Sequence, residues 1–259
     1  MTNNIDKDNF TLVLSGGGAL GIAHLGVLHD MEKQNIVPKE VIGTSMGAII
    51  AASLAIGMRE EEIYKKIKDF TAITKWMTFS FSGNSVVDNK KIEKILKNIF
   101  NDKKMKDVSI PLKIISTNLL NGQKKVFDAN SDVYIYDAVL SSMAIPGLFK
   151  EHKIDNQIYG DGFLCENLGI TEAKHNDILA VDVLGENSFQ RELPDNFLKT
   201  SNVLEMFEKS MRLLIFNQTK TNLKYLRKNI HLIEPDTKDF KTYQFNKHKE
   251  LRELGLGLL

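Results

Sequence analysis

Residues 41–55 constrain the fold of this chain more than any other stretch. They join an apolar run, a Gly-x-Ser-x-Gly turn and a run of small apolar residues. Gly43 and Gly47 have no Cβ, so the chain can pass sharply from a strand into a helix around Ser45. Such a turn lifts the serine hydroxyl above the sheet, beside the free N–H groups of the helix start. The pattern predicts a nucleophilic serine, with a Gly-rich turn before a buried helix as the alternative.

The segments on either side predict strands that alternate with helices. Residues 10–15 form an apolar, β-rich run, three glycines follow, and residues 19–33 carry apolar side chains at helical spacing. The next strand then leads into Ser45. A strand–helix–strand–helix order with short connections is typical of a mainly parallel sheet that is covered on both faces. We therefore expect an α/β protein with three layers.

The rest of the chain continues this pattern. Helices are predicted over residues 59–70, 89–100, 134–143, 202–228 and 243–254. Strands are predicted over residues 112–118, 123–128, 178–184 and 230–233, with two short strands within 149–159. In the long helix we expect five apolar residues to face inward: Leu204, Phe207, Met211, Leu214 and Ile215. No internal repeat, low-complexity linker or convincing domain boundary interrupts the 259 residues.

Charge and cysteine content exclude several classes of protein. A net charge of +1 provides no field that would recruit nucleic acid, so no nucleic-acid partner is expected. The single Cys165 excludes an internal disulfide framework and a cysteine-based metal site. The polar N-terminus is unlike a secretory signal. We expect a cytoplasmic protein, and the sequence leaves its oligomeric state open.

A nucleophile also needs donors for the negative charge that develops on the substrate. Gly16, Gly17 and Gly18 can turn backbone N–H groups into a cavity at the start of the next helix, and neighbouring strands would place them beside Ser45. The alternative is nucleotide binding, because Gly16-x-Gly18-x-x-Gly21 matches the dinucleotide fingerprint. Against it, the next strand carries the serine turn and lacks the acidic residue that would hold a ribose.

The base is less evident from the residues alone. A Ser–His–Asp triad would need one of six histidines. His29 and His231 have no motif around them, and His152 and His175 flank the segment that contains Asp161. His24 lies within the first helical pattern, where a buried polar partner is the simpler explanation. Asp161 stands between Gly160 and Gly162 after two short strands, on what should be an exposed tight turn. A carboxylate there could act as a base, although a simple turn explains the same pattern.

Four ordered motifs together resemble the patatin-like phospholipase family. They are Gly16-Gly17-Gly18-Ala19-Leu20-Gly21-x-x-His24-x-Gly26-Val27-Leu28, Gly43-Thr44-Ser45-Met46-Gly47, Ser141-Ser142-Met143-Ala144-Ile145-Pro146-Gly147-Leu148-Phe149, and Asp161-Gly162. The resemblance covers about residues 10–185. It implies a patatin-like variant of a hydrolase fold, as a single domain over residues 1–259 with a helical C-terminal extension from about residue 200.

The same resemblance implies the chemistry. Family members hydrolyse lipid acyl esters through an acyl-enzyme, without metal or organic cofactor, using a Ser–Asp dyad and no histidine. Ser45 would be the nucleophile, Asp161 the base, and the backbone of Gly16, Gly17 and Gly18 the oxyanion hole. A non-catalytic relative that binds lipid or protein, and an acyltransferase, remain as alternatives.

Three residues depart from the family pattern. Leu20 stands where many relatives carry Arg or Lys, which bears on the preference for anionic lipids. Phe163 adds bulk after Asp161-Gly162, where a small residue is usual. Asn167-Leu168-Gly169 lacks the proline of the family's Asn-x-Pro. None of these changes removes a reacting group.

A lipid chain also needs an apolar surface. Residues 71–87 are the candidate lid or interface, with Trp76, Phe79 and Phe81 as substrate contacts and core filling as the alternative. We therefore expect a lipid or other acyl-ester substrate and transient contact with a membrane surface.

Overall fold

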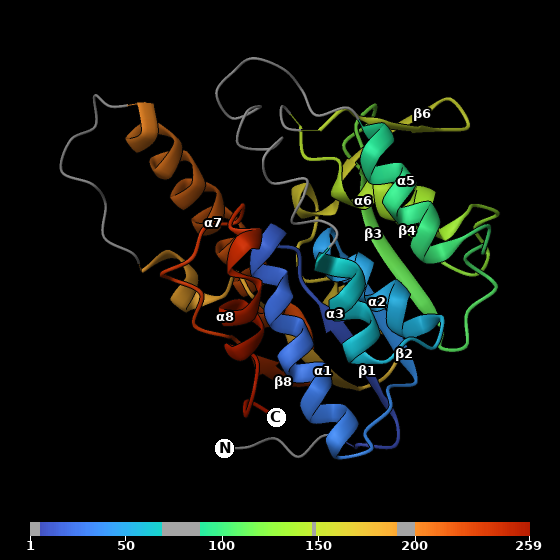
Figure 1. Cartoon of the computed structure of the whole chain (residues 1–259), viewed down its shortest axis with the longest axis horizontal. Coiled ribbons are helices and arrows are strands. Elements are labelled where there is room, and N and C mark those ends of the chain that lie inside the picture. The colour runs from blue at the N-terminus through green and yellow to red at the C-terminus, as the bar shows by residue number, and fades with distance from the viewer. Residues whose placement is uncertain (1–5, 69–88, 147–148, 191–199) are drawn as a thin grey trace.

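A mixed eight-stranded sheet forms the centre of the computed structural model, which describes residues 6–68, 89–146, 149–190 and 200–259 (Figure 1). Five strands run parallel in the order β3-β2-β1-β7-β8. Their bounds are β1 (Phe10–Leu14), β2 (Glu40–Thr44), β3 (Leu112–Asn118), β7 (Asp177–Val181) and β8 (Asn229–Ile233). The carboxyl ends of these strands therefore meet at one edge, where ligands bind in open α/β sheets.

Beyond β3 the sheet becomes antiparallel. β4 (Lys124–Phe127) and β6 (Gln157–Asp161) both pair with β3, and β5 (His152–Ile154) pairs with β6. The register places Asp161 opposite Ser116, near the carboxyl end of β3. This pairing carries the last residue of β6 to the same edge of the sheet as the end of β2.

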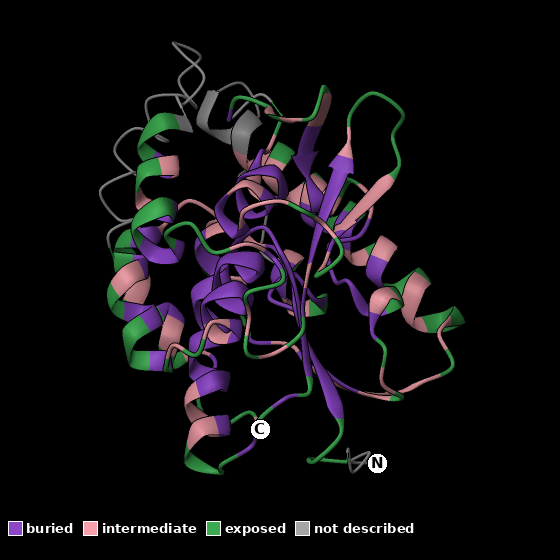
Figure 2. Cartoon of the chain, turned by 90° about the vertical axis from the view of Figure 1, so that its right-hand side faces the viewer, coloured by how far each residue is buried: buried purple, intermediate pink, exposed green. Residues whose placement is uncertain are grey.

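Helices cover the sheet on both faces, which confirms the predicted three layers. The strand residues alternate between two buried clusters: Leu12 and Leu14 of β1 belong to the larger one, and Val13 belongs to the smaller one. Figure 1 shows α1, α2 and α3 together over one part of the sheet, and Figure 2 shows the buried residues running through the middle of the molecule. The helices are α1 (Ala23–Lys33), α2 (Met46–Ala55), α3 (Glu60–Lys68), α5 (Asn89–Phe100), α6 (Ile135–Met143), α7 (Thr200–Tyr225) and α8 (His248–Glu253).

Most predicted elements are found within a few residues of their expected bounds, but two helices differ. The predicted helix over residues 19–33 begins as a 3-10 helix, Gly18–Ile22, before α1. Gly18 has φ +56°, and the N–H of Ala19 donates to the carbonyl oxygen of Thr242 at 2.7 Å, so a distant segment determines this start. The predicted helix over residues 243–254 is reduced to a short 3-10 turn and α8.

The inward face of α7 was wrongly predicted in part. Phe207 and Leu214 are 62% and 63% exposed, whereas Arg212, Ile215 and Thr219 are buried. The guanidinium of Arg212 donates to the carbonyl oxygens of Ser188 and Phe240 and to the carboxylate of Glu208. These hydrogen bonds compensate the cost of burying the charge of Arg212. They therefore turn the Arg212 face of α7 toward the protein, although the apolar pattern of the helix predicted another face.

The candidate lid lies outside the described residues, as do its members Trp76, Phe79 and Phe81. In the described part of the chain, no helix is both long enough and apolar enough to cross a membrane. The single-domain organisation with a C-terminal extension stays a prediction.

Candidate active site

The junction between β2 and α2 holds Ser45 in a strained conformation. Ser45 has φ 52° and ψ −119°, a region that non-glycine residues rarely occupy, and only 6% of its surface is exposed. A Cβ on Gly43 would lie 2.4 Å from the oxygen of Gly47, and one on Gly47 would lie 2.3 Å from the oxygen of Leu14. Only glycines allow these contacts. The turn therefore has the geometry that the Gly-x-Ser-x-Gly pattern predicts.

A second serine supports this turn from α6. The N–H of Ser45 donates to Oγ of Ser142 at 2.8 Å, and that hydroxyl donates to the carbonyl oxygen of Ile115 at 2.5 Å. Ser142 therefore fixes the backbone of Ser45 relative to β3. Sequence reasoning assigned no role to Ser142, although its place in the motif of residues 141–149 was the available signal.

Asp161 lies at the end of β6, beside the serine turn, and is fully buried. The expectation of an exposed turn was therefore wrong, because β6 pairs with β3 inside the sheet. A Cβ on Gly162 would lie 2.8 Å from Cγ2 of Thr44, the residue before Ser45. Oδ1 of Asp161 accepts a hydrogen bond from the N–H of Phe163 at 3.0 Å. The structure thus brings together two side chains that are 116 positions apart in the sequence.

Burial raises the pKa of the Asp161 carboxyl to about 7, since water no longer solvates its charge. The N–H of Phe163, the hydroxyl of Ser45 and the N–H of Gly162 lower the pKa by less. The Ser45 hydroxyl is thus close enough to stabilise the carboxylate. The contact between Ser45 and Asp161 is longer or less well aligned than a standard hydrogen bond, because Oδ2 of Asp161 has no hydrogen-bond partner among the described residues. Bonds of this kind commonly tighten when substrate binds.

The glycine loop lies directly against the serine. A Cβ on Gly16 would approach Cβ of Ser45 to 3.1 Å. The N–H of Gly16 already donates to the carbonyl oxygen of Asn167 at 3.3 Å. Within the described residues, the N–H groups of Gly17 and Gly18 have no acceptor. Both N–H groups are therefore unpaired in that part of the chain, and the role of the glycine loop as an oxyanion hole stays a prediction.

No histidine hydrogen-bonds Ser45 in the described part of the chain, which contains all six. His24 is fully buried on α1, and its Nε2 lies 2.9 Å from the carbonyl oxygen of Ser15. Burial lowers the pKa of His24 to about 4, so this ring is neutral near pH 7 and its Nε2 is the donor. His24 thus anchors the strand end before the glycine loop, as a buried polar partner.

The three departures from the family pattern have clear places in the structure. Leu20 is fully buried in the larger core cluster, and Phe163 packs against the same cluster. Asn167 is buried, and its Nδ2 lies 3.4 Å from the oxygen of Gly16. The turn after Asp161 is therefore linked to the glycine loop without the proline of the family pattern.

The fold and this site define an α/β protein with a strained serine beside a buried carboxylate. The family model of the patatin-like phospholipases matches residues 12–174. Because this is more than half of the chain, the protein belongs to the patatin-like phospholipase family, and the resemblance drawn from its four motifs is confirmed.

Two relatives match 61% and 66% of this chain. An uncharacterized NTE family protein of Mycobacterium tuberculosis is 28% identical over 159 residues, which are 61% of this chain and 43% of the relative. Lysophospholipase NTE1 of Saccharomyces cerevisiae is 29% identical over 180 residues, covering 66% of this chain and 10% of that protein. The chain thus spans less than half the length of these relatives. Among solved structures, VipD from Legionella pneumophila has a TM-score of 0.47 at 13% identity, covering 95% of this chain and 66% of that one.

Proposed function

We propose that this protein is a lipid acyl hydrolase with Ser45 as nucleophile and Asp161 as general base. One observation carries the proposal: a strained serine lies beside a fully buried carboxyl group whose pKa is raised to about 7. A carboxylate with that pKa can take a proton in neutral solution, which an ordinary exposed aspartate does poorly. Membership of the patatin-like phospholipase family supports the reaction class.

In the first half of the reaction, Oγ of Ser45 attacks the ester carbonyl carbon while Asp161 accepts the hydroxyl proton. The carbonyl oxygen becomes an oxyanion, to which the N–H groups of Gly17 and Gly18 donate. When the tetrahedral intermediate collapses, Asp161 returns the proton to the leaving alcohol. An acyl group is then bound to Ser45.

In the second half, water takes the place of the alcohol. Asp161 removes a proton from the water, whose oxygen forms a bond to the acyl carbon. The second intermediate releases the fatty acid, and the proton on Asp161 returns to Oγ of Ser45. Each proton transfer therefore uses the same carboxyl group.

The proposed substrates are ester lipids of the phospholipid and lysophospholipid type. The family and the name of the yeast relative support this class. The exposed apolar side chains of Phe207, Leu213 and Leu214 on α7 support transient contact with a lipid surface. Contacts from Trp76, Phe79 and Phe81 stay a prediction.

Hydrolysis of a p-nitrophenyl ester and of a lysophospholipid by Ser45→Ala tests the proposal. We expect a loss on the order of 10³-fold or more, as in other serine hydrolases. Ser53→Ala is the matched control, because Ser53 is a buried serine of α2. Among the described residues, its hydroxyl donates only to the carbonyl oxygen of Ile49 in its own helix. A fluorophosphonate adduct mapped by mass spectrometry should lie on Ser45. Equal background turnover by the wild type and Ser45→Ala would refute the proposal.

A further inference from the structure

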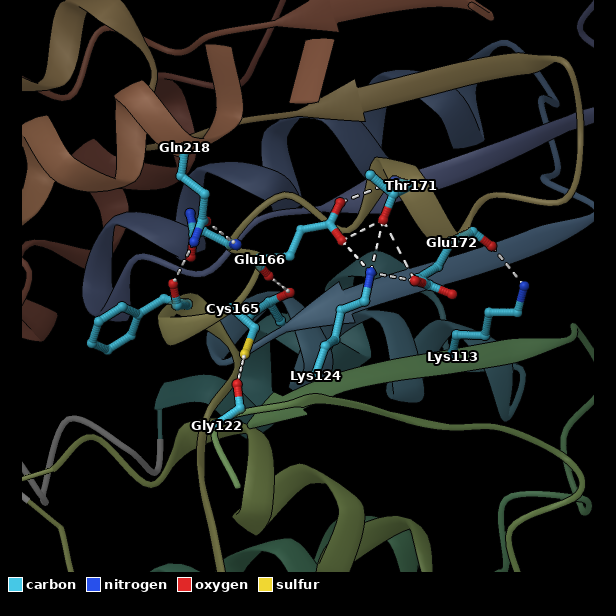
Figure 3. A network of polar contacts seen from close by, with 11 residues as sticks. Lys113, Gly122, Lys124, Cys165, Glu166, Thr171, Glu172 and Gln218 are labelled. Carbon is cyan, nitrogen blue, oxygen red and sulfur yellow. Dashed lines mark hydrogen bonds and ion pairs between the residues drawn. The ribbon is translucent and has the colours of Figure 1, made fainter. Parts of the chain in front are cut away.

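Helix α7 sends one side chain onto the turn that follows Asp161. The amide of Gln218 makes two hydrogen bonds there: its Oε1 accepts from the N–H of Asn167 at 2.8 Å, and its Nε2 donates to the carbonyl oxygen of Phe163 at 3.2 Å. Figure 3 shows Gln218 reaching from α7 to this turn. A single amide therefore bridges two residues that are four positions apart.

Phe163 connects this bridge to the carboxylate. Its carbonyl oxygen accepts from Gln218, while its N–H donates to Oδ1 of Asp161 at 3.0 Å. That N–H bond is the only hydrogen bond of the Asp161 carboxylate with standard geometry in the described residues. Whatever fixes Phe163 therefore also fixes the orientation of the carboxyl group toward Ser45.

The middle of the same turn, at Glu166, is held by Lys124 of β4 and by Thr171. Glu166 is 2% exposed and accepts from the N–H of Thr171 at 3.0 Å. Its carboxylate also pairs with Lys124 of β4 at 2.7 Å (Figure 3). The Glu166 contacts leave Phe163 untouched, so only Gln218 restrains that residue from outside the turn through a hydrogen bond among the described residues.

We propose that Gln218 is a positioning residue that holds Asp161 in its reacting orientation. The residue comes from outside residues 12–174, the stretch that the family model matches. The proposal rests on the proposed function, in which Asp161 is the base. It means that the C-terminal part of the chain completes the site rather than only covering it.

Removal of the bridge can be separated from loss of the helix. Arg212 fastens α7 independently, through the carbonyl oxygens of Ser188 and Phe240. Ile215 and Thr219 are buried on the same side of the helix. A substitution that removes only the amide of Gln218 therefore leaves α7 in place.

The groups around Asp161 make its pKa a readout of the bridge. The carboxyl group is influenced by the Ser45 hydroxyl and by the N–H groups of Gly162 and Phe163. The elements packed against its backbone present uncharged groups: β3 presents the hydroxyl of Thr117, and the end of α6 presents the carbonyl oxygen of Ala144. The charged residue of the turn, Glu166, is paired with Lys124. A weaker bond from Phe163 therefore raises the pKa without interference from a neighbouring charge.

Gln218→Met tests the proposal, because methionine has similar length and cannot form the bridge. We expect kcat to fall about tenfold with KM changed less than about twofold, since the loss affects the reacting carboxylate and not substrate binding. The acid limb of the kcat/KM profile should move to higher pH by about half a unit. Asn217→Met is the matched control: Asn217 is the exposed neighbouring amide, and its substitution should change neither value.

Hydrogen–deuterium exchange on the full chain gives a readout that needs no activity. Peptides that span residues 161–168 should exchange faster in Gln218→Met than in Asn217→Met, with the rest of α7 unchanged. An unchanged pH profile, or a loss of kcat explained entirely by a lower fraction of folded protein, overturns the role of Gln218. If the wild type and Ser45→Ala are equally inactive, the proposed function fails. In that case the exchange rates of residues 161–168 and the pKa of Asp161, measured by NMR, still test whether Gln218 positions Asp161.

Discussion

Replacement of Asp161 by asparagine should stabilise the fold, and the gain should grow with pH. The folded protein holds the pKa of Asp161 at about 7, against 3.8 for the ordinary side chain. Above pH 3.8, ionisation of Asp161 lowers the free energy of the unfolded chain. In the folded protein the same group ionises only near pH 7, so the folded state is stabilised much less. Stability that depends on Asp161 is therefore lost as pH rises between these two values. At 1.36 kcal/mol for each pH unit, the cost is roughly 2 kcal/mol at pH 5 and roughly 4 kcal/mol at pH 8.

Asparagine has no such cost, and its Oδ1 can still accept from the N–H of Phe163. Urea unfolding of the wild type and Asp161→Asn at both pH values measures the difference. The gap in unfolding free energy should widen by about 2–3 kcal/mol from pH 5 to pH 8. Other groups that titrate in this range, such as Asp182 with a pKa of about 6, are common to both proteins and cancel. A gap that stays constant or narrows with pH would show that Asp161 is not a buried acid with a raised pKa.

Three further results are expected. Because Asp161 must be ionised to act as a base, kcat/KM should fall below a midpoint near pH 7, and a flat profile down to pH 5 would contradict its role. Gly47→Ala should cost about 3 kcal/mol or more in urea unfolding, because its Cβ would lie 2.3 Å from a backbone oxygen at the end of β1; a near-normal unfolding midpoint would contradict this packing. Arg252→Met should cost roughly 2 kcal/mol, since it removes the main ion-pair partner of Glu60, which is 2% exposed. In the part of the chain that the structure describes, Glu60 then keeps only His29, at 3.7 Å, as an ion-pair partner. If Arg252→Met and the double variant with Glu60→Gln are equally stable, the buried carboxylate is not the source of that cost.

The sequence predicted the layers of the fold because alternating strands and helices have local patterns, and it singled out Ser45 for the same reason. Ser45 stands in a strand–turn–helix pattern, and the glycines on either side permit contacts that no other residue could make. Asp161 was identified only through four ordered motifs, since an aspartate between glycines is also an ordinary turn. The pairing of β6 with β3, which carries Asp161 to Ser45, depends on contacts over long sequence distances.

The remaining features leave little trace in the sequence. Ser142 and Gln218 each act through two hydrogen bonds to backbone atoms of distant segments. A lone polar residue within a helical pattern has no periodic signal to mark it. The same limit explains the error over α7, where Arg212 is buried and Phe207 is exposed. Two of the partners that compensate Arg212, the carbonyl oxygens of Ser188 and Phe240, come from distant segments whose position no local pattern encodes.

The place of β1 in the centre of the sheet has a consequence for biosynthesis. One edge of β1 pairs with β2, which is synthesised soon after β1. The other edge pairs with β7, which is synthesised more than 160 residues later. During translation the growing chain therefore exposes an apolar, unpaired edge for a long interval. Because such edges favour aggregation, we expect the nascent protein to be vulnerable until β7 and β8 have been made.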